Sequence, residues 1–178
     1  MFSLSRPRTA VLLLGFTLLE LLIVVAIVGI LATLLIPVYG KLRERAQKVQ
    51  CIANLHNLYV AADVYVQQQR HWPQIFLKNY ETIDDHANAW INALAPYGPT
   101  RKTWICPTIQ DLLQDPDYTQ PHQARLDYVS AGFDDKQTSP HQWPTQPWFI
   151  EAGNVHGNGN LVILTDGSVA ETNDLLPK

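Results

Sequence analysis

The chain has 178 residues, of which 13 are Lys or Arg and 16 are Asp or Glu, so its formal net charge is −3. This balance lacks the basic surface that nucleic-acid binding requires, and we expect no nucleic-acid partner. Apolar residues make up 47% of the chain, and they are concentrated near the N-terminus. Their placement, more than their number, indicates a protein that associates with a membrane.

The segment from Ala10 to Tyr39 is an apolar run in which Glu20 is the single ionisable residue. A hydrocarbon core about 30 Å thick needs roughly 20 apolar helical residues, and a signal-peptide core has roughly 7–15. Hydropathy alone therefore predicts an N-terminal membrane anchor. Glu20 does not fit a plain anchor, because a carboxylate inside an apolar helix costs roughly 2.5–3.5 kcal/mol on insertion scales.

The stretch Gly15-Phe16-Thr17-Leu18-Leu19-Glu20 resembles the prepilin processing signal of type IV pilins and type II secretion pseudopilins. Pro37, near the end of the apolar run, fits the same family. The resemblance implies that residues 1–15 form a leader, that a prepilin peptidase cuts between Gly15 and Phe16, and that the new amino group of Phe16 is methylated. It also implies that Glu20 pairs with the N-terminal ammonium of a neighbouring subunit during filament assembly, with Pro37 in the same assembly segment.

Beyond Pro37 the apolar residues continue at helical spacing from Leu42 to Val66, and polar residues fill the other face. We therefore predict one helix from about Phe16 to about Gln69. Residues 16–38 would span the membrane, and residues 39–70 would form the amphipathic, extracytoplasmic half of the same helix. The helix should end before Pro73, because the residue that precedes a proline avoids helical dihedral angles.

Residues 71–178 contain dense turn signals and short candidate elements, which predict a small globular domain. Asp166-Gly167 between two apolar runs is a strong hairpin signal. The fold class expected is α+β: a long N-terminal α-helix packed on a small antiparallel β-sheet, as in pilins. The predicted helices are Asn88–Ala95 and Thr108–Leu113, and the predicted strands are Leu126–Ala131, Trp148–Ile150, Leu161–Thr165 and Ser168–Glu171.

Near the C-terminus, His156 is separated by nine residues from Asp166-Gly167. This spacing resembles the tail of one large group of prepilin-like proteins. The favoured interpretation is that His156 bonds the backbone of its loop while Asp166 shapes the turn. A Ser-His-Asp triad of Ser168, His156 and Asp166 is disfavoured, because Ser168 follows a tight turn and lacks a nucleophile-elbow context. We expect no enzymatic activity.

A metal is the next alternative, since Asp134, Asp135, His156 and Asp166 offer oxygen and nitrogen ligands. Some pseudopilins bind calcium near the C-terminus, but no EF-hand spacing is present here. The sequence also lacks a CxxC motif or a Cys/His cluster that would indicate zinc or redox chemistry. We therefore expect no cofactor or metal, with calcium as the less favoured alternative.

Cys51 and Cys106 are the two cysteines of the chain. An even number of cysteines in an extracytoplasmic domain is compatible with a disulfide, which would join the globular part to the long helix. The alternative is two buried free thiols. The disulfide is the favoured prediction.

Taken together, these features predict a pseudopilin, a structural subunit of a filament assembled from the cytoplasmic (inner) membrane. Its expected partners are the prepilin peptidase, copies of itself and other pseudopilins, a membrane assembly platform and the lipid bilayer. The system expected is type II secretion-like, and the nearest alternative is a type IV pilus or DNA-uptake filament. A further alternative is a membrane-anchored binding or enzymatic domain, for which the aromatic segment Trp143–Trp148 is the candidate surface.

Overall fold

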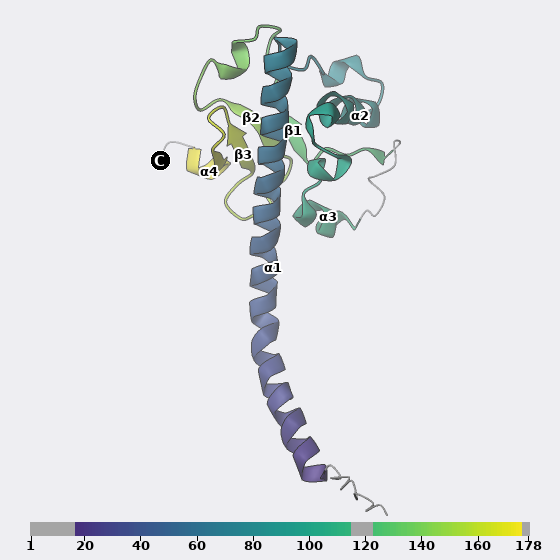
Figure 1. The fold of residues 1–178 in the computed structure, drawn as a ribbon, viewed down its shortest axis with the longest axis vertical. Helices are drawn as coiled ribbons and strands as arrows, with labels where there is room; N and C mark the ends of the chain where they lie inside the picture. Colours follow the sequence, from purple (N-terminus) through teal and green to yellow (C-terminus); the bar gives the residue numbers. More distant parts are fainter. Residues whose placement is uncertain (1–16, 115–122, 176–178) are drawn as a thin grey trace, which may run out of the picture. The chain divides into compact units, whose positions relative to one another are not determined.

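The computed structural model describes residues 17–114 and 123–175, with the backbone alone at positions 34–38. The chain divides into two compact units, Met1–Lys41 and Leu42–Lys178. Helix α1 runs without interruption over Leu18–Gln69, so it begins in the first unit and ends in the second (Figure 1). This agrees with the single helix that the apolar spacing predicts, and the helix continues through position 37.

In the second unit, the last part of α1 packs on a four-stranded antiparallel sheet (Figure 1). The sheet order is β1-β2-β3-β4, so each strand pairs with the next one along the chain. This arrangement confirms the α+β prediction. The strands are β1 (Tyr128–Ser130), β2 (Pro147–Glu151), β3 (Leu161–Leu164) and β4 (Val169–Glu171).

The remaining helices are short, and local signals explain where they begin. Helix α2 (Ile83–Leu94) starts well before the predicted Asn88, because the Thr82 hydroxyl accepts a hydrogen bond from the Asp85 N–H at 3.0 Å. Helix α3 covers Pro107–Leu113, with its proline at the first position. Helix α4 covers Thr172–Leu175, and 3₁₀ turns lie at Leu77–Asn79, Ala95–Tyr97, Arg101–Trp104 and Ser139–His141.

The core lies between α1, α2 and the sheet, and aromatic rings fill it. The Trp72 ring centroid lies 5.1 Å from that of Trp148 and 6.2 Å from that of Trp90. Trp148 also packs against Tyr59 of α1, with 4.7 Å between ring centroids. The apolar stripe of α1 covers this cluster with six fully or almost fully buried residues: Cys51, Leu55, Leu58, Ala61, Ala62 and Val66.

Trp148 is completely buried, and its indole Nε1–H donates a hydrogen bond to the Pro140 carbonyl oxygen at 2.8 Å. Trp143 is 60% exposed. The segment Trp143–Trp148 is therefore not a continuous aromatic surface, and its expected role as the binding surface of an anchored domain is wrong for Trp148.

Candidate functional site

The predicted processing residues Gly15 and Phe16 lie outside the described residues, as does the side chain of Pro37. The described chain begins at Thr17, whose hydroxyl oxygen accepts a hydrogen bond from the Glu20 N–H at 3.2 Å. Thr17 and Glu20 thus occupy the first and last positions of the S/T-x-x-E pattern that caps helix N-termini. This bond uses the backbone N–H of Glu20, and the sequence prediction overlooked the Thr17 cap, although the Thr17-x-x-Glu20 spacing signals it.

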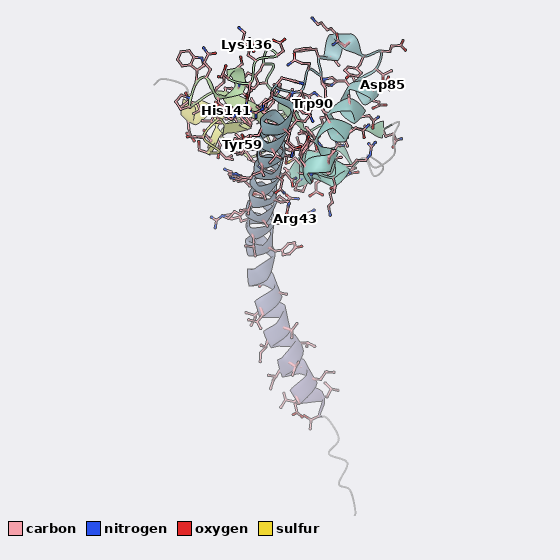
Figure 2. All side chains as sticks on the ribbon, turned by 45° about the horizontal axis from the view of Figure 1, so that its top comes forward. Arg43, Tyr59, Asp85, Trp90, Lys136 and His141 are labelled. Carbon is pink, nitrogen blue, oxygen red and sulfur yellow. The ribbon has the colours of Figure 1, made fainter. Side chains whose placement is uncertain are left out.

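The first part of α1 exposes nearly all of its apolar side chains (Figure 2). Leu18 is 82% exposed, and Leu31, more than three turns later, is 54% exposed. Between them lie nine further exposed apolar residues: Leu19, Leu21, Leu22, Ile23, Val24, Val25, Ile27, Val28 and Ile30. Over the residues that the structure describes, no helix is both long and apolar enough to cross a membrane.

In the second unit, four potential metal ligands meet in the buried interior. They are Cys51 on α1, Cys106 directly before α3, Glu151 at the end of β2, and His156 in the loop between β2 and β3. One ligand atom from each lies within 4.8 Å of all the others. The Cys106 Sγ lies 3.8 Å from the His156 Nε2, which is 3.3 Å from the Glu151 Oε1. These residues are here called the buried cluster.

The titratable groups of the buried cluster are strongly perturbed. Burial raises the pKa of Glu151 to about 9, and the neighbouring Cys106 thiol adds to the rise. The Cys51 side chain and burial together raise the pKa of Cys106 well above its ordinary value. Burial lowers the pKa of His156, and Lys48 lowers it further. These pKa shifts favour a protonated Glu151 carboxyl, a protonated Cys106 thiol and a neutral His156 imidazole.

Both cysteines are free thiols in the structure, so the Cys51–Cys106 disulfide suggested by the sequence is not formed in it. The two thiols instead share their buried environment with Glu151 and His156. The two cysteines thus lie close together, and the bond between them stays a prediction.

The C-terminal motif divides into two separate sites. His156 belongs to the buried cluster, whereas Asp166 and Gly167 form the exposed turn between β3 and β4. In that turn the Ser168 hydroxyl donates to Asp166 Oδ1 at 2.6 Å. A triad serine would instead donate to the imidazole. The turn lies against α1, where the Tyr59 hydroxyl donates to the Thr165 carbonyl oxygen at 2.8 Å.

The carboxylates considered for calcium do not gather around His156. Asp134 Oδ1 accepts hydrogen bonds from the Lys136 N–H at 3.0 Å and from the Ser139 hydroxyl. Among the described residues, the one group of three or more potential ligands is the buried cluster, and it contains neither Asp134, Asp135 nor Asp166.

Glu151 is the residue that sequence reasoning missed. The predicted strand ended at Ile150, and a carboxylate at a strand end carries no signal of burial by itself. The expectation that no Cys/His cluster exists holds along the sequence but not in space, because the four ligands come from segments far apart in the chain.

Comparison with known proteins finds relatives among pilins and secretion pseudopilins. The chain is 37% identical to type II secretion system core protein G of Escherichia coli over 59 residues, which are 33% of this chain and 41% of that protein. It is 44% identical to the type IV major pilin protein PilA of Myxococcus xanthus over 55 residues, which are 31% of this chain and 25% of the pilin. The matched segments thus span less than half of these two relatives.

A longer match covers most of another relative. The chain is 28% identical to type II secretion system core protein G of Aeromonas hydrophila over 127 residues, which are 67% of this chain and 82% of that protein. No family model and no solved structure matches the chain. The names of these relatives are those of pilins and of a secretion-system core protein, which supports the prediction that the chain is not an enzyme.

Proposed function

We propose, from the similarity of this chain to type IV pilins and type II secretion core proteins, that it is a prepilin-like structural subunit of a filament assembled from the cytoplasmic membrane. The observation that carries the proposal is the exposed apolar first part of α1. A large exposed apolar surface marks a site that contacts lipid or another protein. In the proposed cycle, residues 16–38 contact lipid before assembly and neighbouring subunits after it.

Glu20 gives this exposed segment a specific partner. In the proposed filament, its carboxylate pairs with the methylated N-terminal ammonium of Phe16 in the next subunit, after the prepilin peptidase has removed residues 1–15. A carboxylate is costly in lipid when unpaired, so the pairing favours entry into the filament. The other partners proposed are copies of the chain, other pseudopilins and the membrane assembly platform.

The system proposed is type II secretion-like. The similarity to protein G of Aeromonas hydrophila extends over 82% of that protein, whereas the similarity to the Myxococcus xanthus pilin covers 25% of it. A match over 127 residues has to include part of the globular domain, whereas the match to the pilin over 55 residues is shorter than the N-terminal segment 1–70. A type IV pilus or DNA-uptake filament is the alternative.

The first experiment is intact and N-terminal peptide mass spectrometry of the protein from native membranes. The expected result is a chain that begins at N-methylated Phe16. A chain that begins at Met1 would contradict the proposal, and the function would then have to be sought in an anchored extracytoplasmic domain.

A second experiment distinguishes pairing of the Glu20 charge from a local effect of the Glu20 side chain on the helix N-terminus. Glu20→Gln keeps the ability of position 20 to complete the helix cap but removes its charge, whereas Glu20→Ala removes both. Each variant is co-expressed with the wild-type subunit, and its share of sheared filaments is compared with its share of the membrane fraction. Both variants should be depleted from filaments. Normal incorporation of Glu20→Gln with loss of Glu20→Ala would show that Glu20 acts as a cap and not as a charged partner.

A further inference from the structure

We propose that Cys51, Cys106, Glu151 and His156 form a tetrahedral zinc site inside the globular unit. The ligand set is two thiolates, one imidazole nitrogen and one carboxylate oxygen, all of which are accepted zinc ligands. Four side chains from four separate segments converge on one point, and none of them is on the exposed surface. The site is independent of the proposed filament function.

The distances match those that a zinc ion imposes. With zinc bonds of about 2.3 Å to sulfur and about 2.0–2.2 Å to nitrogen or oxygen, tetrahedral geometry places neighbouring ligand atoms about 3.4–3.8 Å apart. The observed separations are 3.8 Å between Cys106 Sγ and His156 Nε2, and 3.3 Å between His156 Nε2 and Glu151 Oε1. All four ligand atoms lie within 4.8 Å of one another. Small shifts would therefore bring all four onto one ion.

Glu151 supplies an independent argument. Its side chain is completely buried, and its polar neighbours are the other three members of the buried cluster: the His156 imidazole and the thiols of Cys51 and Cys106. Buried carboxylates are normally hydrogen-bonded, paired with a cation or bound to a metal, because burial without a partner is costly. The Nε2 of the His156 imidazole lies 3.3 Å from the Glu151 Oε1. A zinc ion would satisfy the carboxylate and the imidazole together.

The surrounding protein holds the ligands in place without the ion. The Cys106 N–H donates to Asp127 Oδ2 at 2.8 Å, and the Arg125 guanidinium fixes that aspartate through Oδ1 at 2.8 Å. Asn54, one turn after Cys51 on α1, donates from Nδ2 to the Ile105 carbonyl oxygen at 3.0 Å, next to Cys106. Outer contacts of this kind orient the ligands of metal sites.

Glu151 and His156 are held in a similar way from the sheet side. The Asn160 amide donates to the Glu151 carbonyl oxygen at 2.8 Å, and Glu151 lies opposite Tyr128 in the β1–β2 ladder. His156 lies on the loop between Glu151 and Asn160, whose two ends the Asn160–Glu151 hydrogen bond joins. A groove of about 460 Å³, lined in part by Lys48, Thr108 and His156, gives the metal a route to the imidazole.

The donor set selects the metal. Two thiolates with a nitrogen donor favour zinc, whereas calcium requires six to eight oxygen ligands. Four protein ligands close the coordination sphere, so the site is structural and not catalytic. Its role is to fasten the amphipathic part of α1 to α3 and to the end of β2.

The first test measures metal and thiols in the full chain, purified in detergent from cells grown with added zinc. The expected result is one zinc ion per chain by elemental mass spectrometry, with Cys51 and Cys106 resistant to alkylation until a chelator removes the metal. A metal-free chain would overturn the proposal. This includes a chain whose intact mass shows the two-hydrogen loss of a Cys51–Cys106 disulfide.

The second test assigns the ligands. Replacement of zinc by Co²⁺ should give the intense visible absorption of a tetrahedral ion and a thiolate charge-transfer band. Cys51→Ser and Cys106→Ser should remove the charge-transfer band or weaken it strongly, and His156→Asn and Glu151→Gln should shift the visible bands and lower the affinity for Co²⁺ at least tenfold. His56→Asn and Glu81→Gln are matched controls at exposed positions. They should leave the Co²⁺ spectrum and the affinity for Co²⁺ unchanged. Unaltered Co²⁺ spectra and affinity in His156→Asn and Glu151→Gln, with native near-ultraviolet circular dichroism, would refute the four-ligand site.

Discussion

The hydroxyl of Tyr59 donates a hydrogen bond to the carbonyl oxygen of Thr165, with 2.8 Å between the two oxygen atoms. Tyr59 lies on α1, and Thr165 directly follows β3 at the start of the turn that leads to β4. The same tyrosine ring packs on Trp148 of the core (Figure 2 labels Tyr59). One side chain thus joins the long helix, the sheet and the C-terminal hairpin.

Tyr59→Phe keeps the ring but removes the hydroxyl that bonds Thr165. The free energy of unfolding should fall by about 0.5–1.5 kcal/mol, the usual net contribution of such a hydrogen bond. Denaturant unfolding of the full chain in detergent micelles, followed by tryptophan fluorescence, measures the change. Tyr39→Phe, at a position that is 69% exposed, is the control and should change stability little. Equal effects of the two substitutions would refute the role of the bond.

Gly167→Ala should destabilise the hairpin turn. Gly167 has φ of +79°, a conformation that costs a residue with a Cβ about 1–2 kcal/mol. The added carbon would also lie 3.4 Å from the Tyr59 ring. Gly132→Ala is the matched control, because Gly132 lacks a positive φ and its new Cβ would lie 3.8 Å from Phe76. Denaturant unfolding of both variants compares their stabilities. An unfolding midpoint of Gly167→Ala as high as that of Gly132→Ala would contradict the prediction.

The carboxyl group of Asp166 should titrate below its ordinary pKa of 3.8, because the hydroxyl and N–H of Ser168 stabilise its charged form. A carboxyl group whose pKa is lower in the folded state stabilises the fold at pH values above its unfolded-state pKa. This stabilisation is lost as the pH falls through its folded-state pKa. The carboxyl ¹³C chemical shift measures this titration directly. Ser168→Ala removes one of the two donors and should move the pKa upward. An unchanged pKa in that variant would exclude the hydroxyl as a cause.

Trp148→Ala should cost about 3–5 kcal/mol in the free energy of unfolding, as large-to-small changes of buried aromatic residues do. Trp148 is completely buried, packs on Trp72 and donates a hydrogen bond to Pro140. Trp143→Ala, five residues earlier at a position that is 60% exposed, should change stability by less than about 0.5 kcal/mol. Calorimetric unfolding of both variants compares them. Similar losses of unfolding free energy in the two variants would contradict the prediction that Trp143 contributes little to the core.

Local patterns in the sequence predicted most of the secondary structure. The apolar spacing predicted the course of α1 as far as Val66, and Pro73 predicted its end near Gln69. Asp166-Gly167 predicted the β3–β4 hairpin. The start of α2 was missed because its signal is the Thr82 cap and not an apolar period. The periodicity of apolar residues and the presence of turn-forming residues involve only a few neighbouring positions. They can therefore be recognised without knowledge of the rest of the chain.

The sequence by itself determined the long helix, the α+β class and the prepilin-like N-terminal signal, because each depends on neighbours along the chain. The tertiary structure alone decided that Trp148 belongs to the core while Trp143 is exposed, and that Glu151 and His156 join both cysteines in one buried cluster. Packing of α1 on the sheet brings Cys51 to residues that follow it by some 50 to 100 positions. No local pattern encodes such a meeting, because it depends on the register of strands and the rotation of a helix about its axis.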